Sequence, residues 1–224
     1  MRDARIAVAL TVLTLGSIAC HQRTSPASES VESPTHLLLS CSIDSSGITL
    51  APAYMLDTRS SPPDNTGDFS VDGLDASGAS LFHYKFTPAE VAHVPGARHL
   101  AFALPLTDAD RRALITIRVT GPNRGNASRG SPTGSQNLPA PVRSSGSDAV
   151  RSAGYSLERA SSSTVQLRFD PHTWAGVMVR DPETREVLAF ATGGALLISS
   201  QASSLLLTFS DGVQSVSRLV SLPR

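Results

Sequence analysis

Charge of one sign, aromatic side chains and long apolar runs are all scarce in this sequence of 224 residues. The 19 basic residues are balanced by 19 acidic ones, so the formal net charge is zero. Neither a basic stripe nor an acidic tail occurs, and we therefore do not expect a nucleic acid as a partner. Beyond the first 20 residues, no apolar run approaches the roughly 20 residues that a membrane-spanning helix needs.

Motifs that would identify an enzyme are also missing. No HExxH zinc-peptidase motif and no GxSxG nucleophile elbow occurs, and Pro132 takes the place of the nucleophile in GSPTG, residues 130–134. A glycosidase carboxylate pair has no such signature, because the separation of the two carboxylates is a property of the fold. The sequence predicts a protein that is not an enzyme and needs no cofactor. An extracytoplasmic hydrolase of carbohydrate or peptide is the alternative.

The first 19 residues have the order of a secretory signal peptide: charged residues, an apolar stretch, then small residues. Two ways of cleaving it both make Cys20 the first mature residue. Ser17-x-Ala19 suits the general signal peptidase, whereas Ser17-Ile18-Ala19-Cys20 resembles the lipobox of bacterial lipoproteins, which usually has Leu where Ser17 stands. We expect acylation of Cys20 and a location in the bacterial cell envelope, facing the periplasm or the exterior. A secreted protein is the alternative.

Residues 20–35 are rich in Ser, Pro and Glu, and we interpret them as a tether behind the lipid. The second cysteine, Cys41, alternates with polar residues in HLLLSCSI and shares a face with Leu37, Leu39 and Ile43. This pattern favours a buried free thiol that behaves as a small apolar side chain. A disulfide with Cys20 is the other possibility in an oxidising compartment.

Short apolar stretches broken by Gly, Pro and Asp predict strands throughout the first half of the remaining chain. The expected strands cover residues 37–43, 48–56, 68–74, 79–87, 98–106 and 115–120. Residues 107–114 can form about two helical turns, with Thr107 as N-cap and Asp110 at the capping-box position. Regularly spaced short strands of this kind are typical of a β-sandwich.

Residues 123–151 are dominated by Ser, Gly, Pro, Asn and Arg and predict a disordered linker. Further strands are expected at residues 155–159, 164–169, 177–181, 186–192, 195–199, 205–210 and 214–222. The turn residues DPETR predict a hairpin over residues 177–192. The predicted fold is therefore all-β, with two antiparallel β-sandwich (Ig-like) units, residues 36–122 and 152–224, joined by the linker.

Several stretches resemble one known kind of domain. They read FSVDGLDASGASLFHYKFTPAEV, RHLAFALPL, IRVTGP, VMVRDPETREVLAFATGG and SDGV. They are similar to the C-terminal β-sandwich region appended to large secreted bacterial proteins, some of which carry an upstream zinc metallopeptidase domain. The resemblance implies an accessory β-sandwich region without the peptidase. Arg185 stands where the pattern usually has a turn glycine.

Histidine is the commonest catalytic and metal-binding side chain, and His36, His83, His93 and His99 fall in the first predicted unit. His83 lies opposite the aromatic face of LFHYKF, so it is expected to face solvent. His93 and His99 flank VPGAR without the spacing of a known zinc site, and no metal is predicted.

Two other groups allow a functional and a structural interpretation. Asp64, Asp68, Asp72 and Asp75 offer oxygen ligands for calcium, but Asp beside Gly is ordinary turn chemistry. Trp174, the only tryptophan, is either a carbohydrate-stacking platform or a packed core residue; we favour the second interpretation.

Taken together, these patterns favour a non-catalytic lipoprotein that serves as a binding or accessory module of the envelope. Its expected partners are the membrane, through the acylated N-terminus, and another envelope protein or a carbohydrate.

Overall fold

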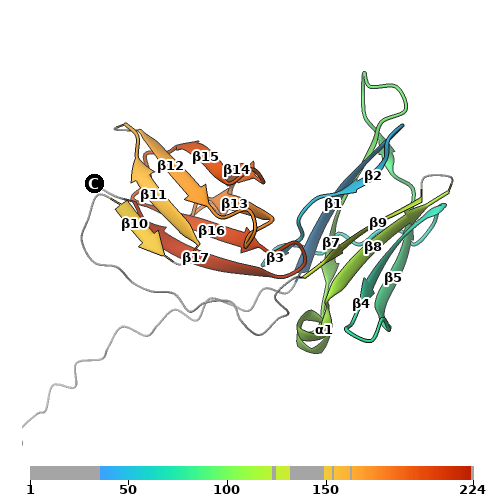
Figure 1. Ribbon diagram of the computed structural model, residues 1–224. Helices are drawn as coiled ribbons and strands as arrows, with labels where there is room; N and C mark the ends of the chain where they lie inside the picture. Colours follow the sequence, from blue (N-terminus) through green and yellow to red (C-terminus); the bar gives the residue numbers. More distant parts are fainter. Residues whose placement is uncertain (1–35, 123–124, 132–148, 153, 162, 223–224) are drawn as a thin grey trace, which may run out of the picture. The chain divides into compact units, whose positions relative to one another are not determined.

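A computed structural model describes residues 36–122, 125–131, 149–152, 154–161 and 163–222 of the chain (Figure 1). All of these residues belong to one compact unit, Ser33–Arg224. The predicted signal peptide, Cys20, the tether and most of the predicted linker lie outside the described residues. Within the described ranges, no helix is long and apolar enough to cross a membrane.

The described chain is all-β, as predicted, with four antiparallel sheets and one short helix. We name the four sheets A to D, and their strands can be followed by the labels in Figure 1. Sheet A contains β2 (Gly47–Leu50), β1 (His36–Asp44), β7 (Arg98–Pro105), β6 (Ala89–Glu90) and β3 (Tyr54–Leu56). Sheet B contains β5 (Ser80–Phe86), β4 (Phe69–Leu74), β8 (Thr116–Gly121) and β9 (Gly125–Gly130).

The other two sheets come from the C-terminal half of the chain. Sheet C contains β10 (Ala149–Ser152), β11 (Tyr155–Arg159), β12 (Thr164–Phe169) and β15 (Ala195–Ser199). Sheet D contains β14 (Val187–Ala191), β13 (Gly176–Arg180), β16 (Ser204–Ser210) and β17 (Ser215–Ser221). The predicted hairpin over residues 177–192 is confirmed, because β13 pairs with β14 across the DPETR turn.

Sheets A and B bury their apolar faces against each other and form the first sandwich. Alternate residues of β1, among them Leu37, Leu39 and Cys41, share one core with Val71 and Phe86 of sheet B. The prediction for Cys41 is confirmed: it is a free, buried cysteine. Sheets C and D form the second sandwich in the same way.

The second core contains the only tryptophan. Trp174 is buried with Leu157 and Leu167 of sheet C and Val177 and Phe209 of sheet D. Its ring centroid lies 5.3 Å from that of Phe209. Trp174 is therefore a packed core residue, as predicted, and its indole face is not available for stacking on a sugar.

Several stretches of the chain depart from the predictions. Residues 48–56 form two strands, β2 and β3, with Pro52 in the break between them. Residues 125–130 and 149–151, expected to be linker, lie in β9 and β10, and β10 extends to Ser152. β9 was missed because it is an edge strand, paired only with β8, and its backbone hydrogen bonds need no apolar periodicity in the side chains.

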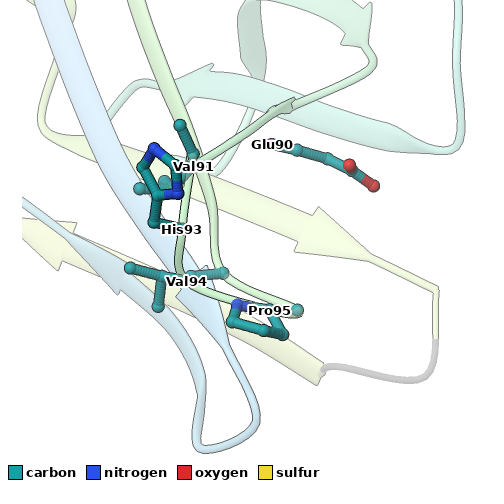
Figure 2. A pocket seen from close by; sticks show the side chains of 8 residues that line it. Glu90, Val91, His93, Val94 and Pro95 are labelled. Atoms are coloured by element: carbon teal, nitrogen blue, oxygen red, sulfur yellow. The ribbon is translucent and has the colours of Figure 1, made fainter.

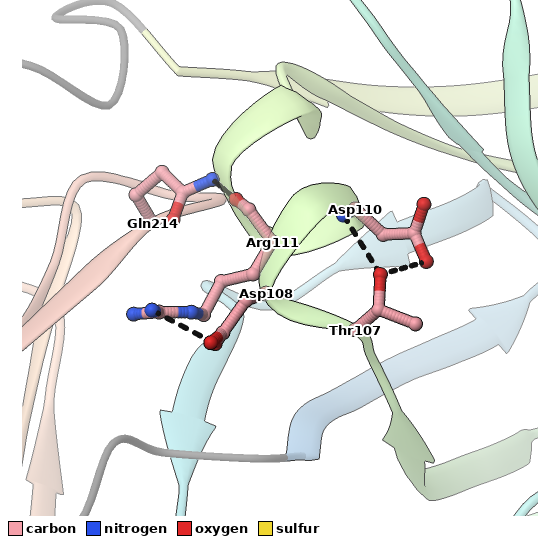
Figure 3. Close-up of polar contacts among 5 residues, drawn as sticks. All are labelled: Thr107, Asp108, Asp110, Arg111 and Gln214. Atoms are coloured by element: carbon pink, nitrogen blue, oxygen red, sulfur yellow. Dashed lines mark hydrogen bonds and ion pairs between the residues drawn. The ribbon is translucent and has the colours of Figure 1, made fainter.

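The helix α1 (Asp108–Ala113) forms where it was predicted. Thr107 accepts a hydrogen bond from the backbone N–H of Asp110 at 3.1 Å, as an N-cap does. The carbonyl oxygens at the C-terminal end of α1 accept hydrogen bonds from a residue of the second sandwich. Gln214 Nε2 donates to the carbonyl oxygen of Arg111 at 2.8 Å (Figure 3). It also donates to the carbonyl oxygen of Leu114 at 2.8 Å.

The turn between β16 and β17 joins the two sandwiches. Val213, at its tip, is fully buried in the core of the first sandwich. Asp211 Oδ1 accepts hydrogen bonds from the backbone N–H groups of Val213 and Gln214 and fixes the turn. Gly212 also accepts from the backbone N–H of Ala53 at 3.0 Å. The described contacts thus connect the two sandwiches through a buried side chain and several hydrogen bonds.

Candidate binding surface

The histidines singled out in the sequence lie at separate places in the first sandwich. His83, on β5, faces solvent as predicted, and its Nδ1 lies 2.7 Å from Oδ1 of Asp72 on the neighbouring β4. His93 lies in the β6–β7 hairpin, and His99 lies on β7 opposite Ala89. Among the described residues, no group of three or more His, Cys, Asp or Glu side chains is placed to hold a metal ion.

Two of the four aspartates considered for calcium, Asp64 and Asp75, stabilise local turns. Asp75 Oδ1 accepts hydrogen bonds from the hydroxyl and backbone N–H of Ser77 and from the backbone N–H of Ala79. These bonds, led by the Ser77 hydroxyl, hold the pKa of Asp75 below its usual value. Asp64 bonds Thr66 in a similar way. Both residues thus follow the turn interpretation.

The feature that stands out is the loop of the β6–β7 hairpin, residues 91–97. Three backbone hydrogen bonds close it: Val91 N–H to Ala97, Val94 N–H to Val91 and Ala97 N–H to Val94. His93 and Gly96 have positive φ values of 64° and 76°, which tighten the loop further. Because Pro95 also fixes one φ angle, the loop presents its side chains from a constrained backbone.

This loop exposes apolar side chains. Val94 is 51% exposed and Val91 is 38% exposed, whereas most large apolar side chains of the first sandwich are buried in its core. Figure 2 shows the side chains of His93 and Val94 on one side of the loop and the Glu90 carboxylate on the other. An open pocket of about 390 Å³ lies within the loop, lined by residues 90–97.

A second open pocket, of about 420 Å³, continues along the base of the hairpin. It is lined by Thr87, Ala89, Glu90, His99, Leu100, Ala101 and Phe102. Glu90 belongs to both pockets, so the two hollows adjoin on the same hairpin. Carboxylate, imidazole and apolar groups are therefore offered together at one edge of sheet A.

The backbone at this edge is also partly open. Ala89 and Glu90 of β6 pair with one end of β7, and Ser61 pairs with Ala103 near the other end. Ala101 lies between these pairings, and it is exposed. Such an edge, short and interrupted, leaves room for a partner beside the hairpin without offering a long strand for aggregation.

Sequence reasoning noticed His93 and His99 around VPGAR but missed the two valines. The available signal was the pair Val91 and Val94 on either side of His93, in a stretch with turn residues and no strand alternation. Apolar side chains in a tight loop have no core to join, so their exposure was predictable once the loop itself was recognised.

In the comparisons with known proteins, no protein-family model and no curated protein sequence matches the chain. The resemblance to the C-terminal β-sandwich regions of large secreted bacterial proteins accordingly stays a prediction.

Proposed function

We propose that this protein is a non-catalytic, extracytoplasmic lipoprotein whose β-sandwich framework presents a binding loop to another component of the bacterial envelope. The lipid on Cys20 holds the protein at the membrane, and the loop of residues 91–97 makes the contact with the partner. The single observation that carries the proposal is the exposure of Val91 and Val94 on a loop closed by its own backbone hydrogen bonds.

The arrangement favours binding for a physical reason. Contact between apolar side chains and water is unfavourable. When a partner covers these side chains, binding is stabilised by about 25 cal/mol per Å² of apolar surface removed from water. A loop that is already constrained loses little conformational entropy on binding, so more of that gain appears as affinity. The mixed pocket lining, with Glu90 and His99 beside the apolar groups, adds hydrogen-bonding groups that can select the partner.

The apolar tip favours a protein over a carbohydrate as the partner. Carbohydrates are usually bound by exposed aromatic platforms and dense hydrogen bonding, whereas the tip offers two valines and a proline. The alternative of a hydrolase would be favoured by titratable groups converging in a deep cleft. Here His83 lies on sheet B, and His93 and His99 lie at the tip and base of an exposed hairpin.

Site-specific photo-cross-linking in the native envelope tests this proposal. A photoreactive amino acid at position 94 should give a discrete adduct with one envelope protein, and Glu90→Gln or Val91→Asp in the same chain should weaken it. The matched control carries the photoreactive residue at position 197, because Leu197 is an apolar residue of sheet C that is 62% exposed, somewhat more than Val94. Equal adducts from both positions, or no adduct from position 94, would contradict the proposal.

A further inference from the structure

The outer face of sheet D carries a second set of unusual side chains, independent of the β6–β7 hairpin. On the inner face of this sheet Val177, Val179 and Leu207 fill the second core. The outer face is partly covered by the first sandwich, where Met178 packs with Tyr54 and Leu56. The same face also holds a buried arginine and several exposed apolar side chains.

The buried arginine is Arg180, at the end of β13. Only 6% of the residue is exposed. Its Nη2 donates to Thr208 Oγ1 at 3.5 Å, the limit of a hydrogen bond, and its Nε has no hydrogen-bond partner. No carboxylate of the described residues lies within ion-pair distance of this guanidinium.

A buried cation without an ion-paired carboxylate is unfavourable and calls for an explanation. Burial, together with the neighbouring charge of Arg185, lowers the pKa of Arg180, and the charge of Asp57 only partly opposes this. An arginine stays charged at neutral pH even so. The guanidinium therefore keeps unused capacity to bind an anion, and an anion that reaches it is bound in a partly desolvated place, where charge-assisted hydrogen bonds are strong.

The exposed apolar side chains surround this position. Phe190 of β14 is 54% exposed and pairs with Met178, and Leu219 of β17 is 65% exposed and pairs with Leu206. Leu188 is also exposed, and it lies where a bulge between β13 and β14 brings the strand past Arg180. Large apolar groups gathered on one sheet face around a charged centre are typical of a protein interface.

We propose that the outer face of sheet D binds an extended segment of a partner protein in which an acidic side chain lies between apolar ones. The carboxylate meets the Arg180 guanidinium, and the apolar neighbours cover Leu188, Phe190 and Leu219. The surface continues an interface that already exists, since the Phe190 ring lies 5.9 Å from the ring of Tyr54 in the first sandwich. The charge of Arg180 decides for an acidic segment over a purely apolar one.

Two short peptides test the proposal on the full mature chain by titration followed by NMR. The probes are acetyl-Leu-Glu-Leu-amide and acetyl-Leu-Gln-Leu-amide, which differ in charge but hardly in shape. The Glu peptide should shift the amide signals of β13 and β16 and bind about tenfold more tightly than the Gln peptide, as a charge-assisted hydrogen bond predicts. Equal binding of both peptides, or shifts confined to other strands, would overturn the proposal.

Variants at two positions separate the charge from the apolar contact. Arg180→Met should abolish the preference for the Glu peptide, and it should not unfold the protein, because it replaces an unpaired buried charge with an apolar side chain. Leu219→Ser should weaken both peptides equally; Leu219 is exposed, so the fold should not depend on it. If Arg180→Met fails to fold, Arg180→Lys serves in its place. Lysine keeps the charge but lacks the planar guanidinium, so this variant should reduce the preference for the Glu peptide over the Gln peptide.

One further arm distinguishes a lipid surface from a protein segment. Vesicles of phosphatidylglycerol offer the same negative charge beside apolar chains. Binding to these vesicles that is lost in Arg180→Met, with no binding of the Glu peptide, would overturn the proposal in favour of a membrane contact. The substitution Val94→Asp should leave peptide binding unchanged. The proposal for sheet D is therefore tested by variants of Arg180 and Leu219, and the proposal for the β6–β7 loop by variants of that loop.

Discussion

At the scale of single residues, Cys41 shows how burial controls chemistry. The thiol lies in the first core, and its burial raises its pKa to about 12. The reactive thiolate is therefore nearly absent in the folded state at neutral pH. A folded-state pKa above the unfolded value also means that this group stabilises the fold below pH 9 and that the contribution is lost as the pH rises toward 12.

A thiol reagent can measure this protection. In the mature chain with Cys20→Ser, Cys41 is the only thiol, and its labelling by a maleimide at pH 7.5 should be slow in buffer and fast in denaturant. The Cys41→Ala chain gives the background. Rapid labelling of the folded protein would show that Cys41 is accessible and would contradict its place in the core.

Arg185 illustrates a residue whose backbone is more informative than its side chain. Its φ of 63° lies in the left-handed region, which glycine adopts without strain. The β13–β14 hairpin thus places Arg185 at a turn position that favours glycine. The turn forms with arginine because Asp181 Oδ1 accepts hydrogen bonds from the backbone N–H groups of Glu183 and Thr184.

At the scale of elements, helix α1 depends on a residue about one hundred positions away in the sequence. Gln214 is buried and bonds the carbonyl oxygens of Arg111 and Leu114. Replacing it by methionine keeps the volume but leaves two carbonyls without a donor, and we expect a loss of about 2 kcal/mol in the free energy of unfolding. Urea denaturation measures this loss.

The same substitution at an exposed glutamine provides the control. Gln201 lies in the exposed turn between β15 and β16, so Gln201→Met should change the free energy of unfolding by less than about 0.5 kcal/mol. Equal effects at both positions would mean that the bonds from Gln214 to α1 add no stability.

At the scale of the whole molecule, the contacts through Val213 and Gln214 predict that the two sandwiches unfold together. Trp174 is the only tryptophan and lies in the second core, so its fluorescence reports the unfolding of the second sandwich. Val71→Ala, in the first core, should cost about 2 kcal/mol and lower the urea midpoint that Trp174 reports. The control Val165→Ala, in the second core, should lower the midpoint similarly.

Independent unfolding would give a different pattern. Val71→Ala would then leave the Trp174 transition unchanged, and circular dichroism would show an additional, earlier transition for the first sandwich. That result would mean that the buried contacts of the β16–β17 turn are too weak to couple the two cores.

The location of the whole molecule depends on Cys20. If Cys20 is acylated, Cys20→Ser should abolish labelling by a fatty-acid analogue and move the protein from the membrane fraction to the soluble fraction, because acyl chains supply the attachment. The matched control is Ser17→Ala, which changes the lipobox-like stretch but keeps the thiol. An unlabelled, soluble protein with Cys20 intact would contradict a lipid anchor and support secretion.

The sequence by itself determined much of the local structure of this protein. Period-two alternation in β1, the capping pair Thr107 and Asp110, and the turn residues before Arg185 each specify an element from its own neighbourhood. The solvent-facing position of His83 and the burial of Cys41 follow from the same alternation. Local rules therefore sufficed for an all-β antiparallel fold.

Only the tertiary structure decided which elements meet. Nothing local in SDGVQS, residues 210–215, indicates that Val213 enters the first core. A single valine in a turn is buried only if residues from another part of the fold pack against it. The edge strand β9 likewise exists through its backbone pairing with β8 and leaves little trace in its side chains. The burial of Arg180 without an ion pair arises in the same way. On the paired strands β13 and β16 Arg180 shares a face with Thr208 and Leu206, and no carboxylate of the described residues forms an ion pair with it. Burial and pairing across the sheets, which depend on the whole fold, created both candidate binding surfaces.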